Sequence, residues 1–180
     1  MKLKTCAATI LAALTFVVLP LHGAMAPAGQ CDQGRYSAWD KAWLTGLGKG
    51  SHFEISAARM ALERGNAEVK KLGSRIMADH TKGLEDVQKV AQNLSIPLGD
   101  TPEPSQEWML AMLAKPSGDF DQAFVQLAVH DHVQDIEETQ EEAKSGCNVA
   151  VRQLAENILP VLRRHLELAK KALISTGGDQ

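Results

Sequence analysis

Apolar residues recur every three or four positions along most of the chain after residue 38, which is the spacing of one face of an α-helix. Alternating β-branched runs and Asn-Gly or Asp-Gly turns, which would indicate strands, are absent from the sequence. The pattern therefore predicts an all-α protein, built as an antiparallel bundle of about four long helices. The four apolar stretches are Trp39–Ala61, Val69–Leu94, Phe120–Ala143 and Val151–Ala172.

Residues that end or cap helices separate the four stretches. Gly65 ends the first helix, and Asn66 is predicted to cap the second. Gly146 ends the third helix, and Asn148 is predicted to cap the fourth. Pro160 lies inside the fourth stretch, whose stripe is long enough that we expect one kinked helix there.

The connection of residues 95–118 between the second and third helices contains several prolines and glycines. Its first part, up to Pro104, cannot continue a helix. A short extra helix is predicted from Ser105 to Lys115, with Trp108 and Met112 among its apolar residues. Pro116 then breaks this helix before the third long one begins.

Residues 1–28 have the features of a secretion signal. Two lysines precede an apolar run of roughly 15 residues, which is too short to span a bilayer of about 30 Å as a helix. Small-x-small cleavage sites end at Ala26 and at Ala28. Because Pro27 would hinder cutting after Ala26, we predict cleavage after Ala28 and export to the periplasm or the medium.

Cleavage would leave a polar lead segment at 29–38, one bundle domain at 39–176 and a frayed tail at 177–180. Nothing in the mature part approaches about 18 consecutive apolar residues, so we expect no transmembrane segment there. Loss of the two signal lysines lowers the basic count from 19 to 17 against 22 acidic side chains, a net charge of about −5. An acidic chain without a basic stripe is a poor partner for nucleic acid.

Two cysteines, Cys31 and Cys147, remain after the predicted cleavage. A single pair in an exported protein favours one disulfide. The alternative is two free thiols.

Four ionisable residues fall on or beside the apolar stripes at a similar height along the bundle. Glu54 lies about 12 residues before the first predicted turn and His80 about 14 residues after it, so an antiparallel hairpin brings them level. His132 and His165 lie about 15 residues before and about 18 residues after the last predicted turn, so they also meet. The sequence therefore predicts one carboxylate and three imidazoles in a single core layer.

Imidazole nitrogens with one carboxylate suit zinc, iron, manganese or copper, and bundle cores are where facing helices build metal sites. Asp79 and Asp131 each precede a histidine of the layer and are predicted to orient a ring on a neighbouring helix. The alternative is a buried Glu–His hydrogen-bond cluster with a structural role, which the same sequence would produce.

An ordered set of short motifs over residues 40–173 resembles the exported bacterial family catalogued as domain of unknown function 4142. The resemblance implies a ferritin-like four-helix bundle and points again to the Glu54, His80, His132 and His165 layer, but it implies no settled activity. Di-iron bundles carry Glu three residues before a histidine on two of their helices, and no histidine of this sequence has that neighbour. If the layer binds metal, we therefore expect a site for one ion. The motifs include Asp40–Leu44, Phe53–Ile55, Met77–His80, Asp131-His132 and Leu159–Leu166.

The ferritin-like topology also implies that residues 95–118 cross over along the length of the bundle. Cys147 would then lie near the start of the first long helix, where the segment after Cys31 is long enough for the two cysteines to bond. The crossover and the disulfide are predicted as a pair.

The sequence therefore predicts a periplasmic bundle that binds a single metal ion or small ligand at its centre, and no catalytic residue is assigned. A second hypothesis is a non-catalytic interaction or stress protein of the cell envelope, with an unidentified protein partner and a histidine layer that is structural or responds to pH. A third is a metallo-oxidoreductase with an open coordination position.

Overall fold

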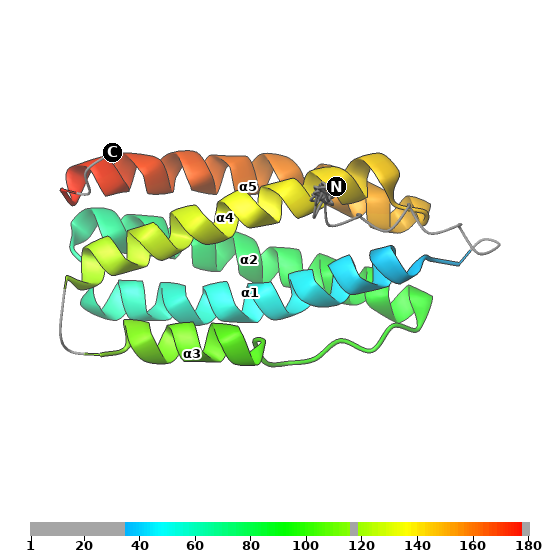
Figure 1. The fold of residues 1–180 in the computed structure, drawn as a ribbon, viewed down its shortest axis with the longest axis horizontal. Helices are drawn as coiled ribbons and strands as arrows, with labels where there is room; N and C mark the ends of the chain where they lie inside the picture. Colours follow the sequence, from blue (N-terminus) through cyan, green and yellow to red (C-terminus); the bar gives the residue numbers. More distant parts are fainter. Residues whose placement is uncertain (1–34, 116–118, 178–180) are drawn as a thin grey trace, which may run out of the picture.

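The computed structural model describes residues 35–115 and 119–177, and this part of the chain contains five helices and no strand. The protein is therefore all-α, as its apolar pattern predicts (Figure 1). The predicted secretion signal and Cys31 lie outside the described residues. The helices are α1 (Ala38–Arg64), α2 (Ala67–Leu94), α3 (Pro104–Leu113), α4 (Phe120–Ser145) and α5 (Val149–Ser175).

Side-chain caps set most of the helix starts. The predicted caps at Asn66 and Asn148 are confirmed, because each side chain accepts hydrogen bonds from backbone N–H groups in the first turn of its helix. Helix α3 begins one residue earlier than predicted and ends at Leu113. Its start is fixed by Pro104 in the first turn and by Gln106, which accepts a hydrogen bond of 3.0 Å from the Glu103 N–H.

The long helices form two antiparallel hairpins, α1–α2 and α4–α5, and the connection between them runs the length of the bundle beside α1 (Figure 1). Helix α3, within this connection, is held against α1 at both of its ends. Lys49 forms a 2.7 Å ion pair with Glu103, and Arg64 donates a 2.8 Å hydrogen bond to the Leu113 carbonyl. The predicted crossover is therefore present, and α4 runs in the same direction as α2. No helix in the described part of the chain is long and apolar enough to cross a membrane.

The apolar core is divided into two clusters, one toward each end of the bundle. Glu54, His80 and His165 lie between the two clusters along α1, α2 and α5, and His132 of α4 meets them there, so the polar layer lies between the clusters. One cluster contains Trp43, Leu44, Val87, Ala91, Ile96, Val151, Leu154 and Ala155. The other contains Ala57, Ala58, Ala61, Val69, Leu72, Ile76, Leu113, Phe124, Val125, Ala128, Ala169 and Ala172.

Small residues let α1 and α2 approach closely about two helical turns from the polar layer. A Cβ atom added at Gly73 would lie 2.8 Å from the Ala61 Cβ and 3.2 Å from the Ala58 carbonyl oxygen, so any larger residue would push the helices apart. This contact fixes the height at which α1 and α2 face one another.

Asp40 joins the start of α1 to the α4–α5 loop. Its side chain accepts hydrogen bonds from the N–H groups of Ser37, Cys147 and Asn148. Glu142 of α4 is fully buried beside it. Burial, together with the hydrogen bond to Asp40, raises the pKa of Glu142 to about 8, so this carboxyl is protonated at neutral pH.

Glu142→Gln should remove a pH dependence of stability. Between the unfolded pKa of about 4.5 and the folded pKa of about 8, the unfolded chain releases this proton while the folded protein keeps it, so stability falls as pH rises. We expect the variant to be more stable than the wild type by about 1–3 kcal/mol at pH 9 relative to pH 5. Urea unfolding at a series of pH values measures the difference.

The matched control is Glu137→Gln on the exposed face of the same helix. It should leave the pH profile of the wild type unchanged. Identical profiles for the wild type and Glu142→Gln would show that Glu142 is ionised in the folded protein.

Candidate metal centre

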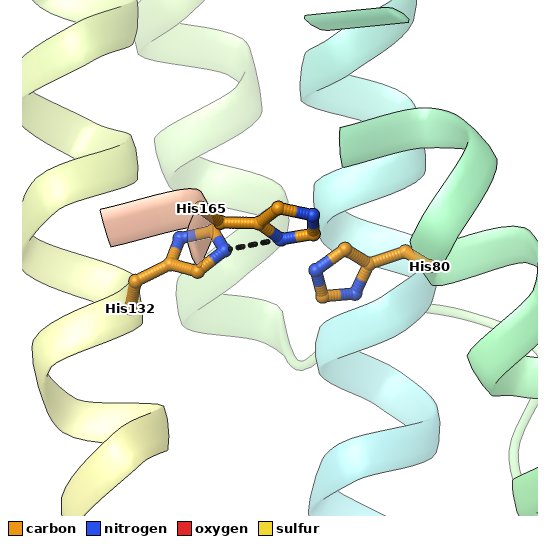
Figure 2. Close-up of side chains that lie close together, drawn as sticks. All are labelled: His80, His132 and His165. Carbon is orange, nitrogen blue, oxygen red and sulfur yellow. Dashed lines mark hydrogen bonds between the residues drawn. The ribbon is translucent and has the colours of Figure 1, made fainter. Parts of the chain in front are cut away.

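Glu54, His80, His132 and His165 come from α1, α2, α4 and α5 and meet in one buried layer. His132 and His165 are 0% exposed, His80 is 7% exposed and Glu54 is 4% exposed. Figure 2 shows the three imidazole rings turned toward one another from three helices, with centroids 5.1–5.8 Å apart. The side chains that residue counting places at one height do lie together.

A chain of hydrogen bonds links two of the rings to the outer side of α2. The Nε2 atom of His132 lies 3.0 Å from Nδ1 of His165, as the dashed line in Figure 2 marks. Nε2 of His165 lies 2.8 Å from a carboxylate oxygen of Asp79. Asp79 in turn forms a 2.6 Å ion pair with Arg75. Asp79 therefore orients the His165 ring from a neighbouring helix, the position predicted for it.

The partners of each nitrogen define where the ring protons lie. Nδ1 of His132 faces two acceptors, the Ala128 carbonyl oxygen at 2.8 Å and Glu54 Oε1 at 3.2 Å, so it carries a proton. Nε2 of His165 faces the Asp79 carboxylate and also carries one. Burial lowers the pKa of His165 to about 4, so at neutral pH its Nδ1 is a lone pair. The hydrogen bond between the rings is then donated by Nε2 of His132 to Nδ1 of His165.

Glu54 supplies the negative charge at the centre of the layer. Burial would raise its pKa, but the adjacent His132 and His80 lower the pKa of Glu54 to about 2. Burial likewise lowers the pKa of His80, and the Glu54 carboxylate outweighs that effect and raises it. Nε2 of His80 and Oε2 of Glu54 form an ion pair. Without a metal ion, the layer is thus a buried carboxylate paired with the rings of His80 and His132.

Two further carboxyl groups of α4 adjoin Glu54. Asp131 was predicted to orient a ring. One of its carboxylate oxygens lies within 4.8 Å of an oxygen of Glu54 on α1. Burial and the Glu54 charge raise the pKa of Asp131 to about 9. Asp135 lies one turn further along α4, and the same two causes raise its pKa to about 7.

The three histidines have the arrangement of metal ligands. One nitrogen of each ring lies within 4.8 Å of the others. The 3.0 Å between Nε2 of His132 and Nδ1 of His165 lets both nitrogens reach one ion at bond lengths of about 2.0–2.1 Å. The opposite nitrogens of these two rings are held by a carbonyl and by carboxylates, which are the outer partners that metal-binding histidines usually have.

Pockets reach the layer from two sides of the bundle. One of about 250 Å³ lies between α1, α3 and α4 and is lined by Asp131 and Asp135. A larger one of about 700 Å³ lies between α2 and α5 and is lined by Asp79 and His80. An ion or small ligand therefore has a path to the layer that does not cross the apolar clusters.

The sequence resemblance is tested by a family model described as Domain of unknown function (DUF4142), which matches residues 25–172. The chain belongs to the DUF4142 family. No curated protein and no solved structure matches it. Since the family's description names no activity, the function of this DUF4142 protein has to be argued from its own side chains.

Sequence analysis of the DUF4142 chain missed Asp135. The signal was present, because Asp135 follows Asp131 by four residues and helical periodicity places the two side chains on one face. Several glutamates follow Asp135 along α4, beginning with Glu137 and Glu138. Asp135 was therefore interpreted as part of the same solvent-exposed acidic face. The pairing of Asp40 with Glu142 left no comparable signal, because it depends on how the ends of three helices come together.

Asp79→Ala in the DUF4142 protein should release the His165 ring. At pH 7, without metal, long-range ¹H–¹⁵N correlation is expected to show His165 protonated at Nε2 alone. In the variant we expect a mixture of His165 tautomers and a loss of about 1–2 kcal/mol of stability, because a buried donor loses its acceptor.

Asp86→Ala on the solvent side of α2 serves as the control and should change neither the tautomers nor the stability beyond about 0.5 kcal/mol. A wild-type His165 protonated at Nδ1 would overturn the assignment of protons in the layer.

Proposed function

We propose that this DUF4142 protein is an exported metal-binding bundle that holds one transition-metal ion between His80, His132 and His165. The observation that carries the proposal is the pair of ring nitrogens 3.0 Å apart on His132 and His165, each with its opposite nitrogen already held by an oxygen acceptor. A metal ion can replace the proton between the rings while every outer hydrogen bond stays in place.

The types of ligand atom in the layer limit which metal ions the site can bind. Three imidazoles with a carboxylate beside them suit zinc, iron, manganese or copper, and the absence of a thiolate or thioether in the layer argues against a site selective for Cu(I). Histidines from three different helices come together, so the folded bundle preforms the site. We assign the protein no catalytic step.

The layer without metal leaves polar atoms poorly satisfied. Among the described residues, Oε2 of Glu54 and Nε2 of His80 are buried and meet as an ion pair without the geometry of a hydrogen bond. Buried ion pairs of this kind rarely add stability compared with apolar residues of the same size. A cation at the nitrogens would give the His80 ring and the Glu54 carboxylate a common partner.

A structural role for the layer is the second candidate. It is favoured by the ion pairs of Glu54 with both His80 and His132, which neutralise charge in the layer without any metal. In that case the protein would act through an interaction at the cell envelope, and protonation of the layer would respond to pH.

Elemental analysis of the mature, untagged protein distinguishes the two candidates. We expect about one equivalent of a transition metal in the wild type, lost in His80→Ala/His132→Ala because two of the three nitrogen ligands are removed. Thermal unfolding with and without a chelator should show the wild type, and not the variant, losing stability when metal is removed.

His52→Ala/His130→Ala removes two histidines that lie outside the layer and is the matched control. It should keep the metal and the response to chelator. Absence of metal from the wild type, even after incubation with zinc, manganese, iron or copper ions, would establish the structural role.

Export and a Cys31–Cys147 disulfide belong to the same proposal. Support comes from the loop beside α1, where Asn148 donates a hydrogen bond to the Arg35 carbonyl and Asp40 binds the Cys147 N–H. Arg35 is four residues after Cys31, a length of chain that spans up to about 13–14 Å. The segment that leads back to Cys31 therefore starts next to Cys147, which supports the pairing.

The mature protein is expected to contain no free thiol and to gain the mass of two hydrogen atoms on reduction. Because the bond would close a long loop, reduction should lower stability by up to about 4–5 kcal/mol on the chain-entropy model. Cys31→Ser/Cys147→Ser should resemble the reduced protein and should not respond to reductant. Two reactive thiols in the folded, exported protein would show that the pair is not bonded.

A further inference from the structure

A second set of ligand atoms lies next to the histidines on the α1–α4 side of the layer. We propose that Glu54, Asp131 and Asp135 form a subsite for a second divalent cation, of the hard, oxygen-preferring kind such as Mn²⁺. The subsite extends the proposed function, because Glu54 would be shared between this cation and the one held by the histidines.

The three carboxyl groups converge from opposite sides. Asp131 and Asp135 are one turn apart on α4, and Glu54 faces them from α1. One oxygen atom of each lies within 4.8 Å of the other two. Three carboxylates at this spacing can surround a cation of the Mg²⁺ or Mn²⁺ type, for which oxygen is the preferred ligand.

One oxygen of this set lacks a partner. Among the described residues, Oδ2 of Asp131 is fully shielded from solvent and accepts no hydrogen bond. Glu54 is only 4% exposed, and within the described chain its two oxygens form ion pairs with His80 and His132, on the histidine side. Buried polar atoms are normally satisfied, so the shielded oxygen of Asp131 points to a missing partner on the α4 side of Glu54.

No lysine or arginine in the described part of the protein forms an ion pair with Asp131 or Asp135. The lysines and arginines of its ion pairs contact Glu103, Asp79, Asp86 and Glu167, and none contacts Asp131 or Asp135. The cluster is therefore not the acidic half of an ordinary salt bridge. The only cations beside it are the imidazoles, on one side.

The pocket between α1, α3 and α4 leads from the surface to this subsite. Asp131 and Asp135 line it together with Glu103 and Glu138, so its wall is acidic and concentrates cations. Gly46 and Gly50 line its α1 side, and a Cβ at Gly46 would meet nothing within 4 Å. A hydrated cation can thus approach the carboxylates without passing the histidines, which the opposite pocket reaches.

The two sites differ in ligand chemistry, so two ions distinguish them. Metal-free protein is first titrated with Zn²⁺, which prefers the imidazoles, and then with Mn²⁺, with free Mn²⁺ followed by electron paramagnetic resonance. The wild type should bind one equivalent of each ion. Asp131→Asn/Asp135→Asn should keep the Zn²⁺ equivalent and lose the Mn²⁺ equivalent, with an affinity lower by about 100-fold or more.

Glu137→Gln/Glu141→Gln is the matched control, because it removes two carboxylates of the same helix, also four residues apart, on its outer side. It should bind both ions as the wild type does. If Asp131→Asn/Asp135→Asn does not fold, Asp135→Asn alone can be used, because it removes one ligand from the half-buried edge of the subsite. We expect it to weaken Mn²⁺ binding about 10-fold or more.

The outcomes separate the two proposals. Zn²⁺ binding without any Mn²⁺ binding, or Mn²⁺ binding that the asparagine variants leave unchanged, would overturn the carboxylate subsite and leave the histidine site standing. Mn²⁺ binding that requires Asp131 and Asp135, in a protein that does not bind Zn²⁺, would support the subsite and overturn the histidine site.

Discussion

Each of the four long helices brings an ionisable side chain to one buried layer in the middle of the core, and the pairing of these side chains holds the helices in register. Glu54 is the centre of the arrangement, because its carboxylate forms ion pairs with histidines of both α2 and α4. A shift of any helix by one turn would separate a buried charge from its partner, which costs several kcal/mol. The close contact of small residues between α1 and α2 also fixes the relative height of the helices. The crossover connection does the same.

The periodicity of apolar residues predicted the helices well, because burial of one helical face leaves a repeating pattern in the sequence. Counting from the predicted turns was also enough to bring Glu54 and three histidines to one height, since the rise per residue of a helix is fixed. Rotation about the helix axis is less constrained by sequence. The closeness of Asp131 and Asp135 to Glu54 was missed for that reason.

Contacts between the ends of different elements were the hardest to foresee. The sequence predicts that α1 begins after residue 38, but it contains no sign that Asp40 would bind the N–H groups of the α4–α5 loop. It likewise does not show that Glu142, four residues before a helix-ending glycine, turns inward and stays protonated beside Asp40. These pairings depend on the relative positions of whole helices, which a pattern along one chain does not record.

The division of the core into two apolar clusters by the polar layer has a consequence for how the chain folds. Either cluster can begin to form from helix pairs that are adjacent in sequence, but the layer is complete only when α1, α2, α4 and α5 are all in place. A partly assembled bundle that lacks one helix would leave a charged or polar group facing a gap in the core. Such intermediates are disfavoured, so the layer adds to the shared apolar clusters in making folding of the two hairpins an all-or-none event.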